Sequence, residues 1–176
     1  MSASSPPSSP VAEPLDKAAG AGQEQRQKVL LLSVEAIIGA GKSTLLEELA
    51  ARPDMVVVRE PLDLWEQDRG GETLLGRYYG DQKANAFMFE TYAMLSRVKA
   101  LRRAENEVTA STRCIVMERS WHSSRRCFAE NSQELGHLDE LEASLHRDMY
   151  DWVRRAQKLL WPSPALLVVQ VAAVRH

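Results

Sequence analysis

The sequence lacks the features that mark secreted, metal-binding or membrane-spanning proteins. Its two cysteines, Cys114 and Cys127, have no CxxC spacing, so they predict neither a disulfide framework nor a zinc site. The longest apolar run, residues 29–34, is too short to cross a bilayer. With 22 basic and 24 acidic residues, the chain carries a formal charge of −2, which argues against a general nucleic-acid binder. We therefore expect a soluble protein with no membrane or nucleic-acid partner.

The first 27 residues differ in composition from the rest of the 176-residue chain. Residues 1–27 consist mainly of Ser, Pro, Ala and Gly, and have too few large apolar groups to offset the entropy of ordering, so we predict a disordered tail. A mitochondrial presequence is the alternative, but such segments are rich in Arg and poor in acids. Here Glu13, Asp16 and Glu24 precede the first arginine, Arg26, which favours a cytoplasmic protein. Residues 28–176 then form one domain.

Strand and helix patterns alternate through this domain. Apolar runs predict four strands, at residues 29–34, 55–58, 114–117 and 165–171. Helical spacing predicts helices at residues 43–50, 84–108 and 138–160. Strands separated by helices indicate an α/β fold whose parallel sheet is joined by right-handed crossovers.

A glycine-containing loop follows the first predicted strand, at residues 35–44. Gly39 and Gly41 let the backbone bend close to a ligand, and the helix that follows presents its positive end to an anion. Lys42 would contact the outer phosphates of a nucleotide, and the Ser43 hydroxyl would bind Mg²⁺. The predicted phosphate-binding residues are therefore Gly39, Ala40, Gly41, Lys42, Ser43 and Thr44.

The loop departs from the usual pattern GxxxxGK[ST] at one position, because Ala36 stands where the first glycine is expected. If the backbone there needs a positive φ, alanine costs about 1 kcal/mol. We expect the fold to tolerate this strain.

Further segments occur in an order that resembles the deoxynucleoside kinases, P-loop enzymes that phosphorylate the 5′-hydroxyl of deoxynucleosides. They are VREPLDLW (58–65), LLGRYYGD (74–81), FMFETYAMLSR (87–97) and ERS (118–120). The similarity covers residues 29–171. The resemblance implies a three-layer P-loop kinase fold, with ATP and Mg²⁺ as cofactors and a deoxynucleoside as substrate.

The resemblance also implies roles for individual residues. Glu60 matches the general base, which would accept the proton of the attacking hydroxyl. Arg119 matches the arginine that stabilises the transferred phosphoryl group, and together with Lys42 completes the expected catalytic set. Glu118 would hold Mg²⁺ beside Ser43. Three further residues match substrate contacts: Trp65 near the base, Tyr79 at the sugar 3′-hydroxyl, and Arg97.

Base recognition differs most from the family pattern. The family usually has Gln where this chain has Glu90, and an ionised carboxylate can only accept hydrogen bonds. The family also pairs the arginine matching Arg97 with an Asp, and Ser124 stands at that position. Residues 90 and 97 share one helix face. We hypothesise that Glu90 replaces the missing aspartate as the partner of Arg97; the rival account is a base that offers Glu90 only donors.

The chain stops five residues after the fourth predicted strand, where family members continue into a helix, an arginine-rich lid and a fifth strand. We therefore expect a P-loop domain whose last strand and lid are missing. The expected activity is ATP-dependent phosphorylation of a deoxynucleoside, and the alternative is a pseudokinase that keeps nucleotide or dimer contacts without turnover. A nucleoside monophosphate kinase fits the motifs less well. By resemblance, a homodimer would form through the helices at 84–108 and 138–160.

Overall fold

Four parallel strands form one sheet in the computed structural model, which describes residues 29–37, 39–160 and 166–170. The strands are β1 (Leu30–Glu35), β2 (Met55–Val58), β3 (Cys114–Glu118) and β4 (Leu166–Gln170), in the order β2-β3-β1-β4. Each pairs in parallel with its neighbour, which confirms the predicted sheet. The predicted tail at 1–27 lies outside the described residues, as do both ends of the predicted fourth strand, residues 165 and 171.

The three predicted helices are confirmed as α1 (Lys42–Ala50), α4 (Gln82–Glu105) and α7 (Glu140–Leu160). Helix α4 begins earlier than expected because the Asp81 side chain accepts a hydrogen bond from the backbone N–H of Ala84 at 3.0 Å. The short elements were not predicted: α2 (Leu62–Glu66), α3 (Leu74–Gly80), α5 (Trp121–Ser123), the π-helical turn η1 (Ser124–Ala129) and α6 (Glu130–Glu134). In the parts of the chain that the structure describes, no helix is long and apolar enough to span a membrane.

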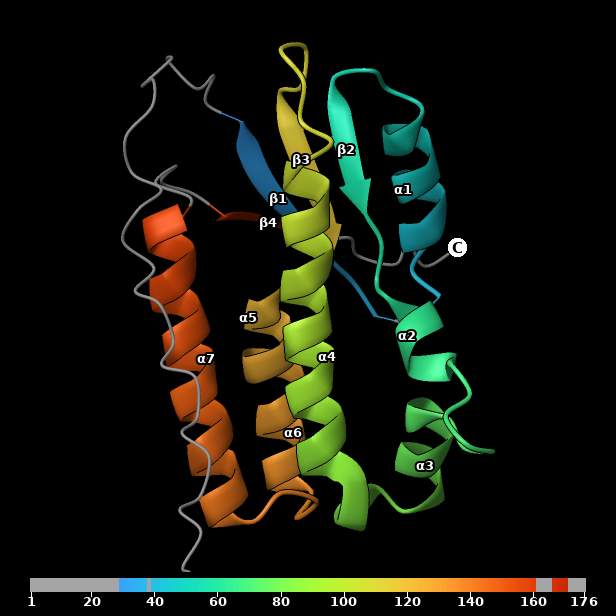
Figure 1. Ribbon diagram of the computed structural model, residues 1–176, viewed down its shortest axis with the longest axis vertical. Coiled ribbons are helices and arrows are strands. Elements are labelled where there is room, and N and C mark those ends of the chain that lie inside the picture. The colour runs from blue at the N-terminus through green and yellow to red at the C-terminus, as the bar shows by residue number, and fades with distance from the viewer. Residues whose placement is uncertain (1–28, 38, 161–165, 171–176) are drawn as a thin grey trace, which may run out of the picture.

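The sheet has helices on both faces, which gives three layers (Figure 1). Side chains of β3 alternate between the two faces, as the period of a strand requires. Ile115 and Met117 pack with α4 and α7, whereas Cys114 and Val116 pack with Leu46 of α1. This arrangement confirms the α/β class with a parallel sheet flanked by helices.

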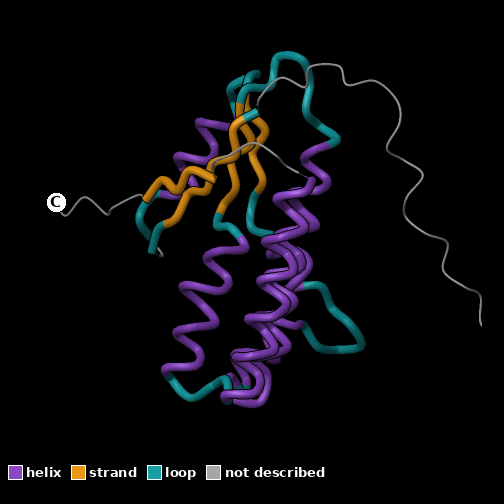
Figure 2. The backbone as a smooth tube through the Cα atoms, turned by 90° about the vertical axis from the view of Figure 1, so that its left-hand side faces the viewer, coloured by secondary structure: helices purple, strands orange, loops and turns teal. Residues whose placement is uncertain are grey.

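Apart from α1, which lies beside the sheet, the helices extend beyond the carboxyl edge of the sheet (Figure 1 and Figure 2). The arrow of β2 points toward α2, and the chain leaves β3 at this same edge to enter α5 (Figure 1). Ligands of open α/β sheets bind outside the carboxyl ends of the strands. A functional site is therefore expected at this edge of the sheet.

Candidate functional site

The loop between β1 and α1 has the backbone geometry that its glycines predict. Gly39 and Gly41 have φ values of 81° and 80°, in the left-handed region where a side chain would cause strain. Gly41 directly precedes α1, so the unpaired N–H groups of the first helical turn lie at the loop. Ala36 does not have a positive φ, so the strain that such a backbone would cause in alanine does not arise. Ile38 lies outside the described residues.

Lys42, the first residue of α1, forms an ion pair with Glu118 at the end of β3. Glu118 also accepts a hydrogen bond of 3.2 Å from the backbone N–H of Glu60. Burial raises the pKa of Glu118, but the hydrogen bonds from Lys42 and Glu60 outweigh burial, so its pKa is below the ordinary value. One carboxylate thus connects the loop, β3 and the segment after β2.

Glu60 is the centre of a second, more buried set of charges. Its Oε2 accepts a hydrogen bond from Arg119 at 2.7 Å, and its Oε1 accepts one from Arg97. The exposed fraction of the side chain is 7% for Glu60 and 4% for Arg97. Two cations beside one buried carboxylate offset the cost of removing these charges from water.

Arg119 reaches Glu60 from a strained backbone position. Its φ is 58°, and within the described ranges it is the only non-glycine residue with a positive φ. Such a conformation costs about 1 to 3 kcal/mol, and residues of this kind cluster at functional sites. The Arg119 guanidinium also donates to the Ala36 carbonyl at 3.4 Å, so it bridges Glu60 and the loop.

Aromatic rings enclose the two arginines. The Arg97 guanidinium carbon lies 5.1 Å from the Trp65 ring centre and 5.3 Å from that of Phe128, and Arg119 lies 5.2 Å from Phe128. The Trp65 indole N–H donates to the Ser96 hydroxyl at 2.9 Å, which fixes the ring. These contacts combine cation–π attraction with exclusion of water.

Glu90 does not pair with Arg97, so the hypothesis that it replaces the missing aspartate is wrong. The Glu90 carboxylate accepts a hydrogen bond from Ser132 at 3.2 Å, and Arg97 instead donates to Glu60 and to the Ser124 hydroxyl at 2.5 Å. Glu90 is only 2% exposed. Burial therefore raises its pKa to about 7, although Ser132 and the charge of Arg97 act in the opposite direction.

The remaining predicted residues lie outside these ion pairs. Ser43 and Thr44 are exposed in the first turn of α1, next to Lys42, and Gly39 and Ala40 lie in the loop. Tyr79 on α3 is 68% exposed and has no hydrogen bond to Glu60 or its arginines. Its neighbour Tyr78 instead stacks on Phe89, with ring centres 4.3 Å apart.

Three residues of the site were not identified from the sequence: Glu35, Ser96 and Phe128. Glu35, at the end of β1, accepts hydrogen bonds from Ser123 and from the backbone N–H of Ser120. It thereby fixes the start of the helical segment that carries Phe128. A carboxylate directly before the glycine loop is the signal that could have drawn attention to Glu35. Nothing in the local sequence marks Ser96 or Phe128, because their contacts come from distant elements.

The described residues of this site supply only part of the coordination shell of a divalent cation. Within the described residues, no group of three or more His, Cys, Asp or Glu could hold a metal ion. The Ser43 hydroxyl and the Glu118 carboxylate are oxygen donors of the type that Mg²⁺ prefers, and Mg²⁺ commonly binds one or two such groups together with phosphate oxygens and water. The two residues therefore fit an ion that also binds phosphates.

A central β1 that leads through a glycine turn into a helix beginning Lys42-Ser43 defines a P-loop nucleotide-binding protein. Comparison with known families is more specific, because residues 32–168 match the family described as deoxynucleoside kinase. The chain belongs to the deoxynucleoside kinase family.

Curated relatives of this chain carry kinase names. Human "Thymidine kinase 2, mitochondrial" is 31% identical over 133 residues, covering 76% of this chain and 48% of the relative. Xenopus laevis "Deoxycytidine kinase 1" is 32% identical over 149 residues, covering 72% and 54%. Mouse "Deoxycytidine kinase" is 30% identical over 149 residues, covering 72% and 55%. The chain thus spans about half the length of these relatives.

The buried Glu90 generates a prediction about stability and pH. Its pKa is about 7 in the folded state, against an ordinary value of 4.5, so between these values the folded state binds more protons than the unfolded state. The free energy of unfolding should therefore fall as pH rises from 4.5 to 7, by about 3 kcal/mol from this group. Glu90→Gln should remove this loss and be the more stable protein at pH 8, as urea unfolding would measure.

Glu134→Gln, at an exposed position on α6, is the control and should follow the wild type. His146 on α7 is also buried and its pKa is lowered mainly by burial, so it contributes to the pH dependence of both proteins. A wild-type and Glu90→Gln pair whose stabilities differ by the same amount at pH 5 and pH 8 would contradict the prediction.

Proposed function

We propose that this chain contains the phosphoryl-transfer centre of a deoxynucleoside kinase, which moves the γ-phosphoryl group of ATP to the 5′-hydroxyl of a deoxynucleoside. One observation carries the proposal. Glu60 lies between two arginines, and its backbone N–H joins it to the Lys42–Glu118 pair at the phosphate loop. The residues that we propose as base, phosphate-binding lysine and transfer arginine therefore lie close together at the carboxyl edge of one sheet.

Each of these groups has its own proposed part in the transfer of the phosphoryl group. The 5′-oxygen attacks the γ-phosphorus, the bond to the bridging oxygen of ADP breaks, and the proton of the hydroxyl passes to Glu60. Arg119 reaches both Glu60 and the Ala36 carbonyl of the loop, so it can stabilise charge on the phosphoryl group during transfer. Lys42 would exchange Glu118 for the β- and γ-phosphates, in the manner of a P-loop lysine.

Ser43 and Glu118 are the residues that would hold Mg²⁺, which neutralises charge on the phosphates when it is bound. Release of Glu118 from Lys42 frees its carboxylate oxygen for this role. The loop amides of Gly39, Ala40 and Gly41 and the hydroxyl of Thr44 complete the proposed contacts to ATP.

We propose Trp65, Arg97, Glu90 and Tyr79 as the nucleoside contacts, and of these Arg97 pairs with Glu60. Trp65 and Arg97 are in contact beside it, and Glu90 lies seven residues before Arg97 on α4. With its raised pKa, Glu90 is partly protonated near pH 7, and a neutral carboxyl both donates and accepts hydrogen bonds as an amide does. Tyr79 is proposed for the sugar 3′-hydroxyl, which requires its exposed side chain to turn toward bound substrate.

Turnover tests the proposal directly. The chain should phosphorylate at least one of the four deoxynucleosides with radiolabelled ATP. Glu60→Gln should lower kcat about 100-fold or more, because the amide cannot accept the proton. Glu66→Gln, at the exposed end of α2, is the matched control and should keep wild-type activity. ATP binding without turnover would reject the enzyme and support a nucleotide-binding pseudokinase.

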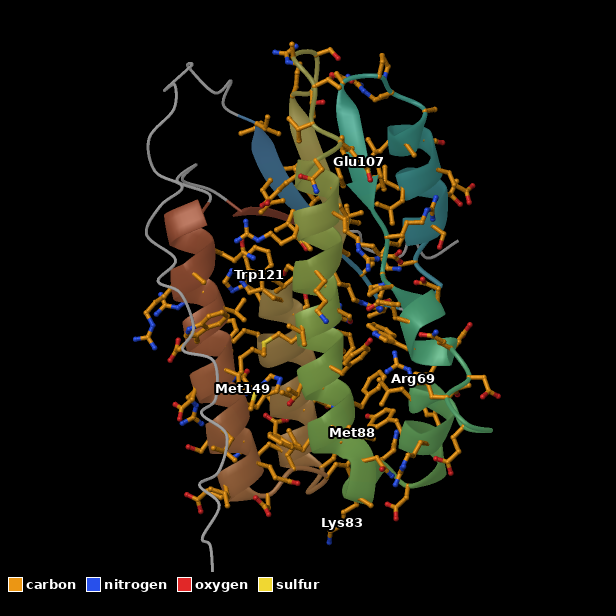
Figure 3. All side chains as sticks on the ribbon, in the orientation of Figure 1. Arg69, Lys83, Met88, Glu107, Trp121 and Met149 are labelled. Carbon is orange, nitrogen blue, oxygen red and sulfur yellow. The ribbon has the colours of Figure 1, made fainter. Side chains whose placement is uncertain are left out.

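A homodimer through α4 and α7 is the partner interaction that we propose. The two helices lie side by side (Figure 1), and Figure 3 labels Met88 on one and Met149 on the other. On each helix, exposed apolar side chains recur three, four or seven residues apart, which is the spacing that puts them on one face of that helix. They are Met88, Leu95, Leu141, Leu145, Met149 and Trp152, with exposed fractions from 39% to 68%.

Charge introduced into this stripe should prevent dimer formation. Wild-type protein should sediment as a dimer, and Trp152→Glu as a monomer, because a carboxylate cannot be buried there without a partner. Leu62→Glu, at a 45% exposed apolar residue on α2, is the control and should stay dimeric. A monomeric wild type, or a dimeric Trp152→Glu variant, in analytical ultracentrifugation would contradict the proposed interface.

The cellular compartment of the protein is a further proposal. Curated relatives include a thymidine kinase whose name contains "mitochondrial". We propose a cytoplasmic protein, because Glu13, Asp16 and Glu24 precede Arg26, whereas presequences are poor in acids.

A further inference from the structure

The Glu35 carboxylate, at the end of β1, is the acceptor for a group of buried serine residues. Its Oε1 accepts hydrogen bonds from the hydroxyl of Ser33 at 2.6 Å and from the hydroxyl of Ser123. The backbone N–H and the hydroxyl of Ser120 also donate to this oxygen, at 3.2 and 3.4 Å. All three serine residues are buried. One oxygen of Glu35 therefore joins the end of β1 to the segment that follows β3.

The chain leaves the sheet after β3 through the backbone of Arg119. The Arg119 N–H donates to the Val34 carbonyl of β1 at 3.2 Å, and its φ of 58° then turns the chain out of the sheet. The next N–H, that of Ser120, donates to the Glu35 side chain. A left-handed backbone at a residue with a side chain persists only where the surrounding contacts hold it. Glu35 supplies such a contact directly after the strained residue.

The backbone of Arg119 decides where its guanidinium lies, because the direction of a side chain is coupled to the conformation of the backbone that carries it. From the left-handed position, the guanidinium donates to Glu60 at 2.7 Å and to the Ala36 carbonyl at 3.4 Å. Relaxation of Arg119 to an extended backbone would move the guanidinium away from both acceptors. A catalytic group displaced by about 1 Å can lower a rate about 100-fold.

We propose that Glu35 is a positioning residue for phosphoryl transfer: it holds the left-handed backbone of Arg119 and thereby directs the guanidinium toward Glu60 and the phosphate loop. The role rests on the proposed function. The described hydrogen bonds of Glu35 go to serine residues, and none goes to Lys42, Glu60 or the Arg119 side chain. Glu35 therefore acts through Arg119, and what the role requires is an acceptor oxygen at this place.

Kinetics of two Glu35 variants test the need for this oxygen. Glu35→Ala removes it and should lower kcat about 10- to 100-fold, with the KM for the deoxynucleoside near that of wild type. Glu35→Gln keeps an acceptor oxygen without the charge and should recover most of the lost kcat. Glu47→Ala, at an exposed position on α1, is the control and should keep wild-type activity.

Two kinetic results would overturn the inference. One is a Glu35→Ala variant that keeps the kcat of wild type. The other is a Glu35→Gln variant as slow as Glu35→Ala, because the charge of Glu35 would then matter and not its hold on the backbone.

A second experiment does not need turnover. Arg119→Gly and Arg119→Ala both remove the guanidinium, but only glycine takes a positive φ without strain. In the otherwise wild-type chain, Arg119→Gly should therefore unfold at a higher urea concentration than Arg119→Ala. Adding Glu35→Ala should abolish or reverse this difference, because the alanine backbone at position 119 can then relax. Adding Glu47→Ala instead should leave the difference unchanged.

The urea midpoints decide the matter even if one variant fails to fold. An Arg119→Gly variant no more stable than Arg119→Ala would overturn the inference without any change at Glu35. A difference that survives Glu35→Ala would also overturn it, because a general loss of stability lowers both variants equally. Glu35→Asp, whose carboxylate is one methylene shorter, replaces Glu35→Ala if that variant does not fold. The expected midpoints in a protein without turnover would support the hold of Glu35 on Arg119 and reject the proposed function.

Discussion

The structure of the site depends on the burial of the Glu60 carboxylate between Arg97 and Arg119. These three residues come from the end of β2, from α4 and from the end of β3, so their attraction fixes elements that are far apart in sequence. None of the three charges would be stable in this position alone, because desolvation of an unpaired ion costs several kcal/mol. The backbone N–H of Glu60 then extends the network to Glu118 and, through it, to Lys42 at the phosphate loop.

Much of the fold could be predicted because its strands and long helices have clear apolar periods. The bounds of β2 agree with the sequence prediction. The parallel direction of the strands follows from the alternation of strands and helices. The segment from Trp121 to Glu134 was not predicted, because besides the local Ser120–Ser123 capping box its start depends on Glu35 from another strand. Tertiary contacts of this kind leave no periodic signal in the sequence.

The candidate site, like the fold, could be predicted in part from the sequence. The carboxyl ends of adjacent parallel strands lie at one edge of the sheet, and four predicted residues meet there. Glu118 ends β3, Arg119 and Glu60 follow β3 and β2, and Lys42 follows the loop after β1. The partner of Arg97 was not predictable, because helix geometry shows which residues share a face but not which distant carboxylate lies opposite. Alanine at position 36 causes no strain, because the left-handed backbone of this site belongs to Gly39, Gly41 and Arg119.

A crystal structure with a deoxynucleoside and an unreactive ATP analogue tests the central claim most directly. The account predicts that the nucleoside 5′-hydroxyl lies within hydrogen-bond distance of Glu60, and that Lys42 has left Glu118 to contact the phosphates. A nucleoside bound with its hydroxyl far from Glu60, or an analogue bound while Lys42 still pairs with Glu118, would contradict it.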